Sequence, residues 1–333
     1  MLAYYQDTND GTYLSTYDIN KNIDLDIKVS EQDIYLQQNS KKLIYTMFDN
    51  FIEIIPCRKE LNIISIDLHL IKNINFENTP ICLDIFEDNL AILFDRGAND
   101  YYISIFNCIY ESDGININEI IEINVGILNC IYNYILLMNE NKILYSKKNT
   151  RDSLNLFLFN ISTKEEYDLG ILHNINYGVA NWVNNYILFN NLHNNKIYIH
   201  NSDNGVKIYE FEYKYRICDI LSTLTKILIQ SNGIIKIYDK NFPSISLIGE
   251  IDIKFLIDSN FGDFDGFLDI IPSSSSDELF IIYTPFSTSI SHKIIKLDLT
   301  NILEISLTLI KEFGNNVNYI KSVIYINNSL QLW

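Results

Sequence analysis

The chain has 333 residues, 47% of them apolar, and a formal net charge of −17 at pH 7. A surface this acidic repels phosphate backbones and anionic lipid headgroups, so the composition argues against nucleic-acid and membrane partners. No uninterrupted apolar stretch approaches the roughly 18 residues that a membrane-spanning helix requires, so we expect none.

A phrase of four short apolar segments separated by polar turns recurs along the chain. Successive copies occupy residues 31–80, 81–126, 127–170, 171–214, 215–261 and 262–315. A period of roughly 45 residues is typical of a four-stranded propeller blade. One blade cannot bury both of its faces, so neighbouring blades must stack and the array must close.

The two ends of the chain complete a further phrase. Residues 318–333 resemble the opening strands of a phrase, and residues 2–29 resemble the later strands. We therefore predict a single all-β domain over residues 1–333, a seven-bladed propeller with four-stranded antiparallel blades. Residues 316–333 and 1–30 would share the last blade and close the ring by pairing the terminal strands. Six or eight blades are the alternatives.

The third segment of each phrase is the most regular one. Its copies end an apolar alternation in Asp or Asn, at residues 12–20, 101–107, 154–160, 196–205 and 233–241. This pattern resembles the WD40 repeat, and Tyr238-Asp239 and residues 329–333 match it best. No phrase carries the Gly-His pair of that family, so its structural hydrogen-bond tetrad does not transfer to this chain. The resemblance implies an interaction scaffold for a protein partner.

Catalytic motifs are absent from the sequence. The histidines are dispersed, and four arginines are too few for the arginine cluster of a sialidase. There is no Gly-x-Ser-x-Gly elbow, phosphate-binding Gly loop or HExxH motif. We predict a non-catalytic protein without a cofactor. A glycan-binding or glycan-hydrolysing propeller and a structural subunit of a large viral or organellar assembly are the alternative functions.

One acidic segment has partial metal-ligand spacing. Asp263, Asp265 and Asp269, with Gly266 at a bend, resemble the calcium loops of integrin-type propellers. The motif occurs once here, whereas that family repeats it in several blades. We therefore predict no metal site and keep this loop as the calcium alternative.

The connections between phrases contain aromatic residues among Asn and Asp. Such aromatic anchors suit a protein-binding surface, and blade topology would place these connections on one rim. The predicted partner-binding residues are Phe76, Tyr177, Trp182, Phe264, Phe267, Phe313 and Tyr319. Trp182 is the preferred anchor. The alternative is that each aromatic only packs between blades.

Cysteine usage and the N-terminal sequence predict a cytoplasmic protein. The five cysteines are widely spaced and mostly lie in apolar segments, which favours reduced thiols over disulfides. The first residues lack the basic and apolar regions of a signal peptide. Abundant Ile and Asn with few Arg are typical of an AT-rich genome.

Overall fold

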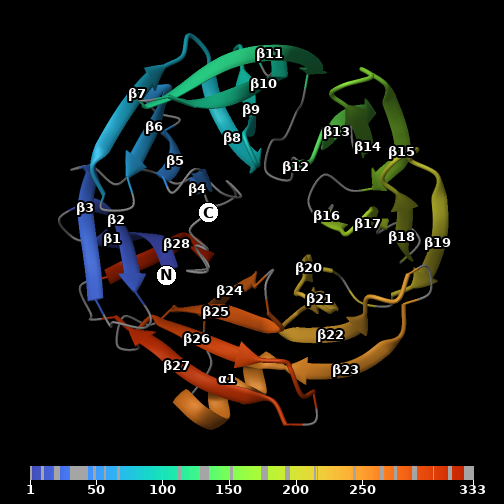
Figure 1. Ribbon diagram of the computed structural model, residues 1–333. Coiled ribbons are helices and arrows are strands. Elements are labelled where there is room, and N and C mark those ends of the chain that lie inside the picture. Colours follow the sequence, from blue (N-terminus) through green and yellow to red (C-terminus); the bar gives the residue numbers. More distant parts are fainter. Residues whose placement is uncertain are drawn as a thin grey trace. The chain divides into compact units, whose positions relative to one another are not determined.

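The fold is seen in a computed structural model that describes most of the chain between residues 2 and 325 (Figure 1). The gaps are residues 9–10, 19–22, 31–43, 48–49, 56–57, 66–67, 99, 112–113, 128–134, 151–152, 174–178, 192–195, 214, 216, 243–244, 263–265, 274–275, 287–290, 303 and 314–316. The described strands form seven four-stranded antiparallel sheets. They divide between two compact units, residues Tyr35–Tyr215 and residues Met1–Ile34 with Arg216–Trp333.

The unit of residues Tyr35–Tyr215 contains four sheets, each a simple meander of consecutive strands. The first has β4 (Ile44–Met47), β5 (Asn50–Ile55), β6 (Glu60–Ser65) and β7 (Leu70–Asn75). The second has β8 (Thr79–Phe86), β9 (Asn89–Asp95), β10 (Asp100–Glu111) and β11 (Gly114–Ile127). The third has β12 (Leu136–Asn139), β13 (Lys142–Thr150), β14 (Ser153–Asn160) and β15 (Glu166–His173). The fourth has β16 (Ala180–Val183), β17 (Tyr186–Asn191), β18 (Lys196–Asn201) and β19 (Lys207–Glu212).

The other unit contains three sheets. Two are meanders, of β20 (Asp219–Ser222), β21 (Lys226–Ser231), β22 (Ile234–Asp239) and β23 (Leu247–Asp252), and of β24 (Gly266–Pro272), β25 (Glu278–Pro285), β26 (Lys293–Asp298) and β27 (Ser306–Glu312). The third joins the chain ends: β28 (Val317–Tyr325) pairs with β1 (Leu2–Thr8), followed by β2 (Gly11–Asp18) and β3 (Ile23–Ser30). The register runs from Leu2 opposite Tyr325 to Thr8 opposite Val317. The two chain ends therefore share one sheet, as their sequences predicted.

Several third strands end in an Asp or Asn whose side chain begins the following turn, among them β14, β18 and β26. Asn160 Oδ1 accepts hydrogen bonds from the backbone N–H groups of Ser162 and Thr163, both at 3.0 Å. Asn201 and Asp298 accept from turn residues in the same way. A short acidic or amide side chain can close such a turn through its own backbone, which explains why this position repeats.

The outermost strand carries at least one extra residue in each of the seven described sheets, and in four of them that residue is an exposed isoleucine. Opposite the end of the third strand, the register skips Ile71, Ile120, Ile208 and Ile248. Each is an isoleucine that is 38–48% exposed. Such bulges twist an edge strand and hinder its pairing with another chain. These outer strands therefore expose side chains to solvent and are poorly suited to pairing with a strand of another chain.

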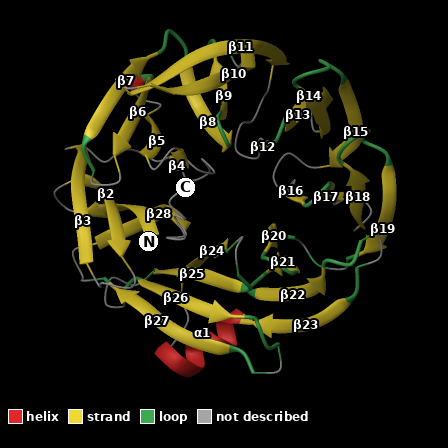
Figure 2. Cartoon of the chain, in the orientation of Figure 1, coloured by secondary structure: helices red, strands yellow, loops and turns green. Residues whose placement is uncertain are grey.

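The all-β prediction missed helix α1 (Ile253–Phe261), the one helix among the residues that the structure describes (Figure 2). It follows β23, and the Asp252 side chain caps it by accepting the Phe255 N–H at 3.0 Å. Ile253 and Ile257, four residues apart, are fully buried on one face of the helix. Because isoleucine is β-branched and common in strands, the local sequence around these two residues also suits a strand. The described residues include no helix that is long and apolar enough to cross a bilayer.

Candidate functional site

Phe76 lies in the short connection between β7 and β8 and forms the base of an aromatic cluster. It is half-buried, and its ring meets Phe94 edge-on with a centroid distance of 4.9 Å. The Phe106 ring lies 6.3 Å away. Phe76 was predicted to be a surface anchor for a partner. The structure shows that its ring packs on the sheet β8–β11, and its role in partner binding stays a prediction.

Arg96 and Tyr102 complete this cluster. The Arg96 guanidinium lies 4.0 Å from the centroid of the Tyr102 ring, which stacks on Phe94 at 5.2 Å. Asn78 Nδ2 donates to the Tyr102 hydroxyl at 3.0 Å, and Arg96 pairs with Glu122 of β11. Arg96 is held by the turn between β9 and β10, where the register places Phe94 opposite Tyr102. The strand pairing therefore stacks an arginine on a tyrosine at the end of the sheet where the turn between β9 and β10 lies.

The surroundings of Arg96 are acidic. The side chains of Arg96 and Glu122 are 34% and 47% exposed. The hydrogen bond to Glu122 raises the pKa of Arg96 against the opposing effect of burial. Burial raises the pKa of Tyr102, which Asn78 and Arg96 counteract. Carboxylates at Glu119, Glu122 and Asp100 outnumber the single cation, so this part of the surface favours basic groups.

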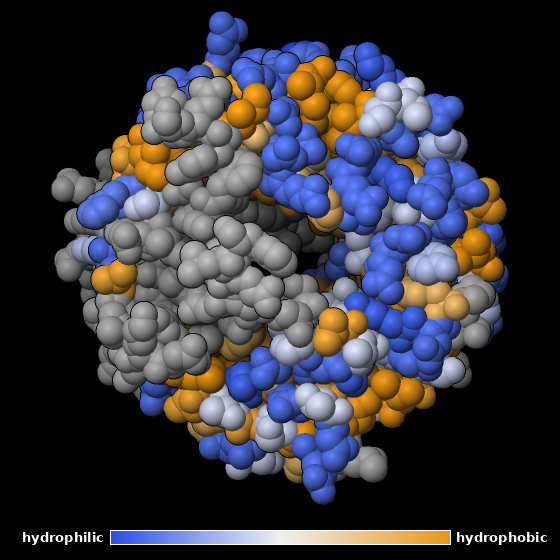
Figure 3. All heavy atoms as spheres, in the orientation of Figure 1, coloured by the Kyte–Doolittle hydropathy of each residue, from blue (hydrophilic) through white to orange (hydrophobic). Residues whose placement is uncertain are grey.

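Exposed apolar residues continue this surface along the same strands. Ile109 of β10 is 43% exposed, and Ile120 of β11 is 48% exposed and lies between Glu119 and Glu122. In Figure 3 hydrophobic residues gather over β10 and β11, and again over β19. We call Arg96, Tyr102, Glu119, Ile120 and Glu122 the β11 surface. It combines an arginine–tyrosine stack, carboxylates and an exposed isoleucine.

Trp182 lies within β16 and not in a connection between sheets. It is half-buried and packs against the core cluster that includes Phe189 and Ile187. Its indole Nε1 is buried without a hydrogen-bond partner among the described residues. The expectation that Trp182 lies in a connection was therefore wrong, because β16 extends over this residue, and its role in partner binding stays a prediction.

Among the remaining predicted aromatics, the structure describes the burial of the Phe313 side chain alone. Phe313 is only 5% exposed, with Lys311 Nζ 4.9 Å from its ring centroid. Phe267 and Tyr319 lie within β24 and β28 instead of in loops. Tyr177 and Phe264 are outside the described residues. Sequence reasoning missed Arg96 and Tyr102. A local signal for them exists, because Phe94 and Tyr102 flank a turn that contains one of the four arginines.

The acidic calcium motif is only partly described. Asp263 and Asp265 lie outside the described residues, and Asp269 is an exposed residue of β24 whose Oδ1 accepts the Ile270 N–H at 3.0 Å. Within the described part of the chain, no group of three potential ligands comes together. The absence of a metal site stays a prediction.

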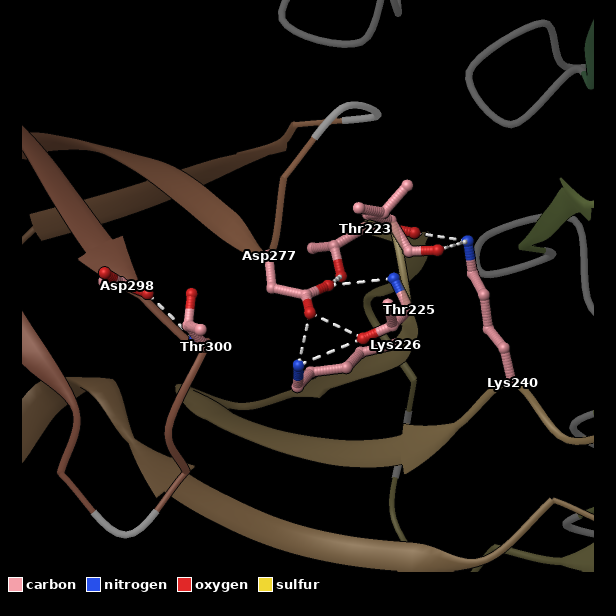
Figure 4. A network of polar contacts seen from close by, with 8 residues as sticks. Thr223, Thr225, Lys226, Lys240, Asp277, Asp298 and Thr300 are labelled. Atoms are coloured by element: carbon pink, nitrogen blue, oxygen red, sulfur yellow. Dashed lines mark hydrogen bonds and ion pairs between the residues drawn. The ribbon is translucent and has the colours of Figure 1, made fainter.

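A second polar cluster joins the sheets β20–β23 and β24–β27 (Figure 4). Asp277 accepts from Lys226 Nζ at 2.5 Å, from both Thr225 Oγ1 and N at 2.5 and 2.9 Å, and from Thr223 Oγ1 at 2.6 Å. Burial raises the pKa of Asp277, but these donors outweigh it and hold the pKa well below its usual range. Lys240 Nζ donates to the Thr223 and Leu224 carbonyls, and burial lowers its pKa.

Both oxygens of Asp277 are occupied in this cluster. The Lys226 and Asp277 side chains are only 8% and 11% exposed. A carboxylate with four donors has no lone pair to spare for a ligand. We therefore interpret this cluster as a tie between two sheets and the β11 surface as the better candidate for binding.

Comparisons with known proteins support the fold. No family model matches the chain, and no curated protein matches its sequence. Hsv2 of Kluyveromyces lactis, with its loop 6CD replaced by a Gly-Ser linker, is similar in structure with a TM-score of 0.56 at 13% identity. That alignment covers 93% of this chain and 98% of Hsv2. Apo AztD of Citrobacter koseri has a TM-score of 0.54 at 12% identity, with 97% of both chains covered.

A candidate 6-phosphogluconolactonase of Bacteroides fragilis is also similar. Its TM-score is 0.55 at 13% identity, covering 97% of this chain and 98% of the other. This finding corrects the prediction of a non-catalytic protein, because a fold shared with a candidate enzyme does not exclude catalysis. At such low identities the comparisons establish the fold, and together with the four-stranded sheets they indicate a β-propeller.

Proposed function

We propose that the chain is a seven-bladed, WD40-like propeller that serves as an interaction scaffold in the cytoplasm, with a protein partner bound at the β11 surface. Seven four-stranded sheets and the pairing of β28 with β1 support the ring. The wide spacing of the five cysteines, most of them in apolar segments, favours reduced thiols and so supports a reducing compartment.

The observation that carries the binding proposal is the composition of the β11 surface. Arginine and tyrosine are enriched among the residues that dominate binding energies, and a stacked pair loses little side-chain freedom on binding. Glu119 and Glu122 flank the exposed Ile120, so the surface fits a segment with apolar side chains between basic ones. The net charge of −17 would speed the approach of such a partner at low salt.

The experiment compares Ile120→Lys with Ile208→Lys. Both are exposed bulge isoleucines of outer strands, so the second variant controls for general effects on folding and charge. A partner is first captured from the native source on the wild-type chain and then purified, and its affinity for each variant is measured by calorimetry at two salt concentrations.

We expect Ile120→Lys to weaken binding at least about tenfold, corresponding to about 1.4 kcal/mol, and Ile208→Lys to have little effect. Binding should also weaken as salt rises. Equal losses in both variants, or binding that strengthens with salt, would refute the β11 surface as the site.

A further inference from the structure

His292 closes the hydrogen-bonded end of strands β26 and β27. It directly precedes β26, and its carbonyl accepts the N–H of Phe313, which directly follows β27, at 3.0 Å. The residue is 7% exposed. Its Nε2 atom is buried, and no described residue forms a hydrogen bond with it.

The described groups next to His292 include a buried cation. Lys293 is also 7% exposed, and its Nζ lies 3.1 Å from Glu312 and 2.8 Å from Ser291 Oγ. Ser291 Oγ also hydrogen-bonds Glu312, so this carboxylate is already shared. Two further titratable residues lie along these strands. Lys311 has its Nζ over the Phe313 ring, and Tyr283 of β25 lies opposite Lys293 of β26 in the sheet.

We propose that His292 is a proton-sensitive latch: protonation of its buried imidazole opens the end of strands β26 and β27. A protonated imidazole carries N–H donors on both ring nitrogens, so Nε2 would become a buried donor without an acceptor beside the buried Lys293. Opening the strand ends exposes the ring to water and relieves both effects.

The direction of the pH dependence follows from the neighbouring groups. Burial, and secondarily Lys293, lowers the pKa of His292 below its usual value near 6.5. The folded strand ends are therefore most stable above that pH and lose stability as the pH falls through the range between the two pKa values. Ser291 and Lys293 lower the pKa of Glu312, so this carboxylate remains ionised at pH 5 and above.

The latch lies where the chain leaves β27 for β28. Phe313 is separated from Val317, the first residue of β28, by three residues, and β28 pairs with β1. Opening at Phe313 therefore loosens the connection to the strand that joins the two ends of the chain.

Amide hydrogen exchange of Phe313 in the full chain tests the latch. After correction for intrinsic exchange, its protection should fall between pH 7.5 and 5.0, by at most about 30-fold for one proton with an unfolded pKa near 6.5. The fall should vanish in His292→Phe, which cannot be protonated, and persist in His69→Gln, which changes an exposed histidine. A fall that survives in His292→Phe, or no fall in the wild type, would refute the proposal.

An NMR titration of the wild-type chain tests the proposal even if the His292→Phe variant does not fold. The imidazole of His292 should titrate below the ordinary histidine value near 6.5 in an NMR titration. A His292 midpoint equal to or above that value would overturn the latch by itself.

Discussion

Replacing Asp277 with Ala should strongly destabilise the sheets β20–β23 and β24–β27. Lys226 would keep its buried position without a counter-charge, since its side chain is only 8% exposed. Thr223 and Thr225 would lose the acceptor of their hydroxyl groups at 2.6 and 2.5 Å. Removing one partner of a buried ion pair costs about 3–5 kcal/mol, because the other charge is left unpaired.

Asp203→Ala is a matched control. Asp203 accepts from Lys142 at 2.6 Å and also links two neighbouring sheets, but its side chain is 69% exposed. An exposed ion pair contributes about 0–1 kcal/mol. The two substitutions thus remove the same chemical group and differ in burial.

Urea denaturation followed by circular dichroism measures both effects. We expect a loss of at least about 3 kcal/mol in the free energy of unfolding for Asp277→Ala and less than about 1 for Asp203→Ala. Because its donors lower the pKa of Asp277, its contribution is present above the unfolded value of about 3.9 and disappears as the pH falls below it. The difference from wild type should therefore narrow in acid. Equal losses in both variants would refute the argument from burial.

Three further outcomes follow from the described structure. Deleting residues 317–333 removes β28 and exposes the edge of β1, so light scattering should reveal aggregates; a monomeric truncation with an unchanged melting temperature would contradict this. Trp182→Ala should cost about 3 kcal/mol of stability, because the ring packs against the core, and unchanged urea midpoints would show that this packing is unimportant. Millimolar calcium should leave the melting temperature unaltered, whereas a rise lost in Asp263→Ala/Asp265→Ala would establish a calcium site.

Much of the strand framework was predictable because its signals are local. Alternation of apolar and polar residues indicates a strand within a short sequence window. The side chains of Asn160, Asn201 and Asp298 accept hydrogen bonds from backbone N–H groups two residues further along the chain. The likeness of residues 2–29 to later strands and of residues 318–333 to opening strands also foretold the pairing of β1 with β28.

Helix α1 and the position of Trp182 were not predictable in the same way. Ile253 and Ile257 suit either a helix or the end of a strand, and the packing of α1 against the core decides between them. Trp182 follows residues that resemble a loop, but pairing with Ile187 places it in a strand. Tertiary packing overrides local preference at such positions.

The sequence by itself determined the repeat, the strand pattern and the acidic charge. The first two depend on residues close together in the chain, and the net charge is the sum of the charged side chains. Only the tertiary structure decided which side chains meet. Glu122 pairs with Arg96 across 26 positions of sequence, and Asp277 binds Lys226 across 51. Strand register and sheet stacking set such contacts, and a shift of one residue would turn these side chains to the opposite face.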